Sequence, residues 1–151
     1  AMSYKMNVFA YDPFKKIKNK KVIQKINYKS VLRKSDIVFI CVNLNEKTKN
    51  MINQNWFKNI KKGSVMINTS RGEIVVEKEI IKSLKSKKLS CYATDVISNE
   101  QKDVSKNSLI RFSKGNDNLI ITPHVAGLTY ESESKAAEQS FLTIKEYFKK
   151  K

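Results

Sequence analysis

The sequence contains few of the residues that usually build metal sites, disulfide frameworks or phosphate-binding loops. Its 151 residues include one histidine, two cysteines, two prolines and four glycines. Cys41 and Cys91 show neither Cys-x-x-Cys nor Cys/His spacing, which argues against a metal site, and we expect both to be buried free thiols within strands. No Gly-x-Gly-x-x-Gly turn can be built from the four glycines, which are Gly63, Gly72, Gly115 and Gly127.

Long hydrophobic runs are also absent. The longest, residues 37–42, is far too short to span a bilayer, and residues 1–11 lack the basic start and cleavage site of a signal peptide. We therefore expect a cytoplasmic protein with no membrane partner. A hydrophobic content of 40% is typical of a globular protein, and 151 residues are enough for one domain with its own core.

Arginine is scarce although the chain is strongly basic. The net charge is +16, yet only Arg33, Arg71 and Arg111 are arginines, and the other basic residues are lysines scattered along the chain. A one-sided basic face could bind nucleic acid by releasing counterions from phosphates, but bidentate recognition of phosphates and bases favours arginine. We therefore favour a solvated, lysine-rich surface over a nucleic-acid partner. Binding of DNA or RNA at physiological salt would contradict this.

Strand and helix patterns alternate along the chain. The segment at residues 36–42 is apolar on both faces, which is typical of a parallel strand covered by helices. The pattern therefore predicts an α/β fold, an incomplete Rossmann-like doubly wound parallel sheet with helices on both faces. Strands are predicted at residues 6–11, 36–42, 64–68, 90–96 and 118–122, a weak extended piece at 25–28, and helices at 30–34, around Trp56 and Phe57, at 77–87 and at about 130–149.

Three polar side chains follow predicted strands. Arg71 lies in Asn-Thr-Ser-Arg-Gly, Glu100 ends the run after the strand at 90–96, and His124 lies in Thr-Pro-His-Val-Ala-Gly. Because the carboxyl ends of parallel strands meet at one edge of a sheet, we expect a guanidinium, a carboxylate and an imidazole to gather there. These groups suit the oxidation of an alcohol beside a carboxylate. The alternatives are a structural histidine and a surface salt bridge of Arg71.

Several motifs, in a fixed order, resemble one protein family. They are VFAYDP at 8–13, SDIV at 35–38, NTSRG at 68–72, TDV at 94–96 and TPH at 122–124. With matches from about residue 2 to the end, the sequence resembles the nucleotide-binding domain of the D-isomer-specific 2-hydroxyacid dehydrogenases. The resemblance implies an NAD-dependent oxidoreductase that acts on the CH–OH group of a D-2-hydroxy acid and transfers hydride to or from NAD. It implies a 2-hydroxy or 2-keto acid as the substrate.

The resemblance also implies roles for the three polar residues. His124 matches the group that takes the substrate hydroxyl proton during oxidation and returns it during reduction, which suits an imidazole because it titrates near neutral pH. Glu100 matches the carboxylate that orients this imidazole. Arg71 matches the residue that binds the substrate carboxylate and polarises its carbonyl group.

Five further residues match cofactor-binding positions of the family. Asp12 matches the carboxylate that accepts from the adenosine ribose hydroxyls and repels a 2′-phosphate, which implies NAD over NADP. A turn-forming role before Pro13 is compatible with this. Val42 and Asn43 match the backbone on the adenine side, with Asn43 in place of the usual proline. Thr69 matches a residue beside the nicotinamide ribose. Asp95 matches the carboxylate that accepts a hydrogen bond from the nicotinamide carboxamide, and the alternative for Asp95 is a sheet-edge cap.

The sequence also departs from the family pattern. Gln101 stands in place of the proline after the catalytic glutamate, and Ile97-Ser98 replaces an aromatic step. Residues 2–5 match only the tail of the helix that follows the glycine-rich turn, so the first strand and that turn have no counterpart here, and neither has the substrate domain. Two origins would explain these missing segments: a truncated or split reading frame that begins at Met2, or an excised piece of a longer enzyme.

The missing strand has a structural consequence. In the order 3-2-1-4-5-6 it would lie between the strand that ends at Asp12 and the strand that ends at Val42, so two apolar edges are left exposed. We therefore expect residues 1–151 to form a single partial NAD-binding domain, in which residues 36–149 keep the family arrangement. Residues 1–35 are expected to be repositioned or swapped in a homodimer.

Two functional hypotheses follow. The first is a fragment of a 2-hydroxyacid dehydrogenase that is inactive until another polypeptide supplies the glycine-rich turn and the substrate domain. The second is a remnant without catalytic activity that dimerises or binds a partner.

Overall fold

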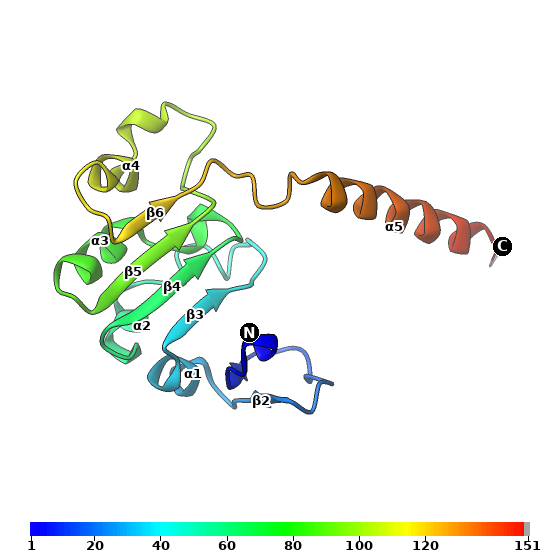
Figure 1. Cartoon of the computed structure of the whole chain (residues 1–151), viewed down its shortest axis with the longest axis horizontal. Helices are drawn as coiled ribbons and strands as arrows, with labels where there is room; N and C mark the ends of the chain where they lie inside the picture. Colours follow the sequence, from blue (N-terminus) through cyan, green and yellow to red (C-terminus); the bar gives the residue numbers. More distant parts are fainter. Residues whose placement is uncertain (150–151) are drawn as a thin grey trace.

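The computed structural model describes residues 1–149 and places a parallel four-stranded sheet at the centre of the molecule (Figure 1). Its strands are β3 (Ile37–Ile40), β4 (Ser64–Asn68), β5 (Leu89–Thr94) and β6 (Leu119–Ile121), hydrogen-bonded in the order β3-β4-β5-β6. All three pairings are parallel. Each strand lies within a stretch for which the sequence predicts a strand, apart from the first residue of β5, and the predicted Rossmann-like α/β fold is confirmed.

Short helices connect the strands. They are α1 (Tyr28–Lys34), α2 (Gln54–Asn59), α3 (Glu77–Lys85) and α4 (Ser108–Ser113), together with the 3-10 turns η2 (Gly72–Ile74) and η3 (Val104–Lys106). Another 3-10 turn, η1 (Met2–Tyr4), precedes the first strand. Asparagine side chains cap three of the helices: Asn27 accepts from Ser30 N, Asn53 from Asn55 N and Asn107 from Leu109 N. α3 begins after Val76, which provides no side-chain cap.

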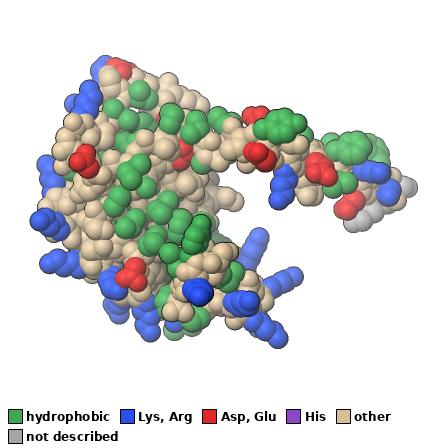
Figure 2. All heavy atoms as spheres, in the orientation of Figure 1, with side chains coloured by type: hydrophobic (Ala, Val, Ile, Leu, Met, Phe, Trp, Pro, Cys, Tyr) green, Lys and Arg blue, Asp and Glu red, His purple; other side chains and the backbone are tan. Residues whose placement is uncertain are grey.

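Alternate strand residues point to opposite faces of the sheet, and the two faces differ. Met66 and Tyr92 are almost fully buried and belong to the hydrophobic core, which also contains Leu32, Phe57, Ile80, Leu84 and Leu109 from the helices. On the other face Ile37, Phe39 and Ile120 are exposed, Phe39 to 57%. In Figure 1 no helix crosses in front of the four strands, and Figure 2 shows hydrophobic side chains gathered over them. We call this the open sheet face.

A second, separate sheet lies near the N-terminus. It pairs β1 (Val8–Ala10) with β2 (Val22–Gln24) in parallel, and no ladder joins it to the four-stranded sheet. The weak extended piece expected at residues 25–28 lies instead at residues 22–24, because the backbone of this segment pairs with Val8–Ala10. The pairing of β1 with β2 and the succession β3-β4-β5 match the order 3-2-1-4-5-6 without its strand 1, and β6 is a further strand beyond that order. Whether residues 1–35 are repositioned or swapped in a dimer stays a prediction.

The last helix, α5 (Tyr130–Lys149), projects away from the body of the molecule (Figure 1). None of its residues is buried, and its large apolar side chains, among them Phe141, Leu142, Ile144 and Phe148, are exposed. Over residues 1–149 no helix is both long and apolar enough to cross a membrane. The last two lysines of the chain lie outside the described residues.

The prediction that both cysteines are buried is wrong for Cys41. This thiol is exposed because β3 already ends at Ile40, so that Cys41 lies in the loop beyond the strand. Cys91 lies in β5 as predicted, but it is only half-buried, and this partial burial raises the pKa of its thiol. Both cysteines are free.

Candidate functional site

The carboxyl ends of β3 to β6 meet at one edge of the sheet because all four strands run parallel. Arg71 follows β4, Asp95 and Glu100 follow β5, and His124 follows β6. The topology therefore places the candidate catalytic residues at the same edge, as the sequence predicts.

A hollow lies between the segments that follow β3 and β4. It is lined by residues 41–44 and 69–71, which include the predicted cofactor residues Val42, Asn43 and Thr69 as well as Arg71. Ser70 Oγ donates a 2.8 Å hydrogen bond to the Ile40 carbonyl oxygen and so ties the two segments together. The Arg71 guanidinium is exposed, and its Nη1 donates to the Ser70 carbonyl oxygen. Arg71 is therefore accessible to a ligand in the hollow.

His124 and Glu100 are in direct contact. His124 Nδ1 lies 2.8 Å from Glu100 Oε1, and both side chains are partly exposed, to 46% and 32%. An ionised carboxylate can only accept, so a neutral imidazole paired with it carries its proton on Nδ1 and presents the lone pair of Nε2. This is the arrangement in which Nε2 can take a proton from a hydroxyl group.

Asp95 holds the backbone around His124. Its Oδ1 accepts from Thr122 Oγ1 and from Val125 N at 3.0 Å, and its Oδ2 accepts from Ala126 N at 2.9 Å. Burial opposes ionisation of the Asp95 carboxyl, but the hydrogen bonds from Thr122, Ala126 and Val125 and the nearby His124 outweigh it, so that its pKa lies below its ordinary value. These contacts favour the sheet-edge cap. Oδ2 accepts one hydrogen bond, from Ala126 N, and can accept a second one from a ligand.

The backbone of His124 is in the left-handed region, with φ +55°. Such a conformation disfavours residues other than glycine and costs about 1–2 kcal/mol. His124 N donates to the Thr122 carbonyl oxygen, and Asp95 binds the two residues that follow. The surrounding hydrogen bonds therefore keep the His124 backbone in this strained conformation at the sheet edge.

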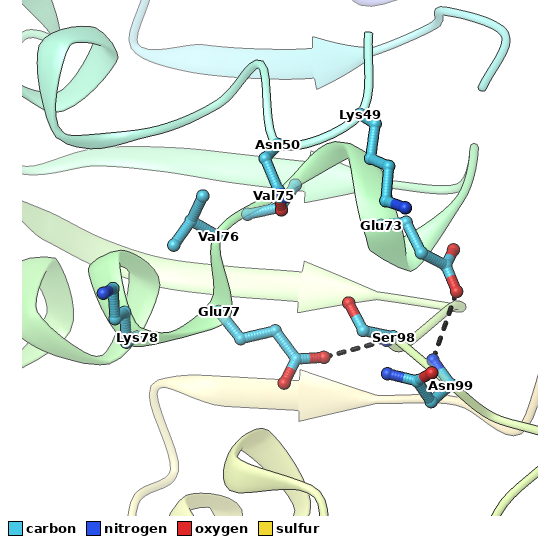
Figure 3. Close-up of a pocket in the computed structure, with 9 residues that line it drawn as sticks. All are labelled: Lys49, Asn50, Glu73, Val75, Val76, Glu77, Lys78, Ser98 and Asn99. Atoms are coloured by element: carbon cyan, nitrogen blue, oxygen red, sulfur yellow. Dashed lines mark hydrogen bonds between the residues drawn. The ribbon is translucent and has the colours of Figure 1, made fainter. Parts of the chain in front are cut away.

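Two glutamates that the sequence analysis did not single out contact the segment before Glu100 (Figure 3). Glu73 Oε1 accepts from Asn99 N at 3.1 Å, and Glu77 Oε1 accepts from Ser98 N at 2.8 Å. Both line a second hollow, between η2, the start of α3 and residues 98–99. Their partners lie 21 to 26 residues away in the sequence, so no local pattern could have revealed these contacts.

Asp12 lies apart from the other candidates, just beyond β1 in the separate sheet. Its Oδ1 accepts from Phe14 N and Lys15 N, so the turn-forming role is present. Oδ2 has no hydrogen-bond partner within residues 1–149 and can accept from a ligand. No hydrogen bond connects Asp12 to the other candidate residues.

The sequence profile of the "D-isomer specific 2-hydroxyacid dehydrogenase, NAD binding domain" matches residues 1–126. The chain belongs to this family. It shares the NAD-binding domain fold of the D-2-hydroxyacid dehydrogenases.

Curated members of the family are clearly similar in sequence. The (S)-sulfolactate dehydrogenase of Chromohalobacter salexigens is 34% identical over 142 residues, which cover 92% of this chain and 43% of that protein. The D-3-phosphoglycerate dehydrogenase of Archaeoglobus fulgidus is 31% identical over 130 residues, covering 85% of this chain and 24% of that protein. The chain thus spans less than half the length of these relatives.

Solved structures agree with this assignment. The NAD complex of a D-isomer-specific 2-hydroxyacid dehydrogenase from Lactobacillus delbrueckii ssp. bulgaricus superposes with a TM-score of 0.79 at 26% identity, covering 87% of this chain and 43% of that chain. The Aquifex aeolicus D-lactate dehydrogenase, in complex with NAD and lactic acid, has a TM-score of 0.76 at 26% identity, with coverage of 98% and 48%.

Proposed function

We propose that this chain is the NAD-binding, catalytic part of an oxidoreductase that acts on the CH–OH group of a D-2-hydroxy acid. The observation that carries the proposal is the 2.8 Å contact between His124 Nδ1 and Glu100 Oε1 at the sheet edge where Arg71 also lies. Family membership and the relatives that act on 2-hydroxy acids support it. In this proposal the contact fixes the protonation state of the group that moves the substrate proton.

Each residue has one role in the proposed reaction. Arg71 binds the substrate carboxylate through its planar fork of N–H donors. His124 Nε2 accepts the hydroxyl proton as the alcohol is oxidised, and Glu100 stabilises the imidazolium that forms. In the reverse direction the imidazolium returns this proton to the carbonyl oxygen.

The residues present fit NAD in part. The hollow beyond β3 and β4 lies where open α/β sheets bind ligands, and Val42, Asn43 and Thr69 line it. Asp12 Oδ2 is able to accept from ribose hydroxyls. When bound, NAD supplies the acceptor or donor of the hydride. No glycine pair in the sequence can form the turn that binds the pyrophosphate, so we propose that the chain alone binds NAD weakly and is inactive.

Substitutions in an enzyme that contains this chain with its substrate domain and glycine-rich turn test the catalytic roles. Arg71→Ala and His124→Ala are each expected to abolish turnover of the 2-hydroxy acid, because one removes the carboxylate contact and the other the proton acceptor. Turnover at the wild-type rate in either variant would disprove that role. Lys85→Ala, an exposed change on α3, is the control that should leave turnover unchanged.

The second candidate function is that of a dimerising remnant without catalytic activity, and the open sheet face supports it. Titration of NAD against the isolated chain by calorimetry separates the two. Saturable binding of NAD, even if weak, would favour a cofactor site, whereas no binding up to millimolar NAD would favour the remnant. The two free cysteines suit a reducing compartment, and we place the protein in the cytoplasm.

A further inference from the structure

Glu77 contacts both ends of the long loop that carries Glu100. Its Oε1 accepts from Ser98 N at 2.8 Å, and its two oxygens accept from Asn107 Nδ2 at 2.9 and 3.0 Å. Ser108 Oγ donates to Oε2 at 3.0 Å. Figure 3 shows the Glu77 carboxylate reaching from the start of α3 towards Ser98. One half-buried carboxylate therefore joins the beginning of the loop to the start of α4.

Asn107 completes this closure. Its Nδ2 also donates to the Ser98 carbonyl oxygen at 3.3 Å, while its Oδ1 accepts from Leu109 N and Ile110 N at the start of α4. The residues on either side of Glu100 in the loop, 99 and 101–106, are exposed, so little apolar packing holds this segment. Its position therefore depends on hydrogen bonds from its two ends.

A backbone contact reinforces the first of these ends. A Cβ atom on Gly72 would lie 2.0 Å from the Ile97 carbonyl carbon and 2.3 Å from Ser98 N, so η2 packs directly on the loop. Glu73, in the same turn, accepts from Asn99 N, the residue next to Glu100. The path from Glu77 to the imidazole is thus short: Ser98, Asn99, Glu100 and His124.

We propose that Glu77 is a positioning residue, which sets the place of Glu100 and so the contact between Glu100 and His124. The proposal rests on the proposed function, in which that contact matters for proton transfer. Glu77 touches neither His124 nor the hollow beyond β3 and β4, so it acts through the loop alone.

The single histidine offers a direct measurement. His124 is the only imidazole in the chain, so its two ring ¹⁵N signals report one site without assignment ambiguity. With Glu100 in contact, Nδ1 carries the proton of the neutral ring, whereas loss of this acceptor favours the tautomer protonated on Nε2. Glu100→Ala provides the spectrum of the uncoupled imidazole.

Glu77→Gln is the test, because it keeps the size of the side chain but turns one acceptor into a donor that faces Asn107 Nδ2. In this variant the ¹⁵N ring signals of His124 are expected to move from their wild-type positions towards the positions in Glu100→Ala. In Ser108→Ala they are expected to move in the same direction, but less. Glu79→Gln, two residues along α3, is the matched control and should keep the wild-type spectrum. Backbone amide spectra of each variant verify that the fold is retained.

The proposal is overturned if Glu77→Gln and Ser108→Ala are folded and keep the wild-type ring signals while Glu100→Ala shifts them. That result would still support the contact between Glu100 and His124. If Glu100→Ala also leaves them unchanged, no pair exists and the positioning role falls with it. In the complete enzyme, Glu77→Gln should lower kcat on the order of tenfold with little change in KM, less than the 10²–10⁴-fold of a general acid–base group. Full activity of His124→Ala there would instead disprove the proposed function, whatever the ring spectra show.

Discussion

At the scale of single residues, Gly72 is the glycine of this chain whose surroundings leave no room for a side chain. Any side chain there would put its Cβ 2.0 Å from the Ile97 carbonyl carbon, which is a backbone atom and cannot rotate away. We expect Gly72→Ala to lower the free energy of unfolding by about 3 kcal/mol, because the turn and the Glu100 loop must separate. Urea unfolding followed by circular dichroism measures this.

Gly115→Ala is the control for that experiment. A Cβ at Gly115 has no heavy atom within 4 Å, and its φ is not in the left-handed region. The expected change is within about 0.5 kcal/mol. Equal losses in the two variants would mean that the contact between Gly72 and Ile97 does not matter for stability.

Asp95 makes stability depend on pH. Its pKa is lower in the folded chain, so its stabilisation is complete above the unfolded value of about 3.9 and is lost as the pH falls through the folded pKa. Asp95→Asn is expected to lower the free energy of unfolding by roughly 1–3 kcal/mol at pH 7. The substitution replaces one accepting oxygen by an NH2 donor, which then faces the N–H group of Val125 or Ala126. The difference from wild type should shrink below about pH 4 in urea unfolding. A constant difference from pH 7 to 3 would contradict the role of the charge.

The residues that the sequence could reveal are those with a strong local signal. His124 is unique, Arg71 is one of three arginines, and both follow recognisable strands. The contact of Glu100 with His124 lies where the motif order predicts it, although the catalytic roles stay predictions. Glu77 was not foreseen, because an acidic residue in the first turn of a helix is expected simply from the helix dipole.

At the scale of elements, the start of α4 depends on Asn107 in two ways. Its Oδ1 caps the helix, and its Nδ2 donates to Glu77. Asn107→Asp keeps the cap but brings a second carboxylate against Glu77, so we expect it to lose about 1–2 kcal/mol of stability at pH 7. The double variant with Glu77→Gln should recover part of this loss, and a double-variant cycle in urea measures the coupling. Strict additivity would show that the two side chains do not interact.

Most strands and helices could be predicted because their apolar periodicity is local. The ends were less accurate: β3 stops at Ile40 and not at residue 42, since Cys41 and Val42 pair with no strand. β2 was misplaced because Val22–Gln24 forms a strand only through its pairing with β1, which a local pattern does not show.

At the scale of the whole molecule, the open sheet face leads us to predict self-association. Phe39 and Ile120 are exposed to 57% and 53%, and burial of such surface stabilises an interface by about 25 cal/mol per Å². We expect the chain to sediment as a dimer, and more completely at high salt because the net charge of +16 opposes association.

Phe39→Lys tests this prediction, and Asn55→Lys on the exposed side of α2 adds the same charge elsewhere. Sedimentation velocity should show a monomer for the first variant and wild-type behaviour for the second. A wild-type chain that remains monomeric at high salt would disprove the predicted dimer.

The helix α5 has a separate consequence for how the chain opens. It buries no residue, so its 20 residues can melt and re-form without disturbing Met66, Tyr92 or any other part of the interior. Amide hydrogen exchange should therefore be graded along the chain of the Phe39→Lys variant, which is expected to be monomeric: rapid throughout α5, and slow enough in β4 and β5 to report global unfolding.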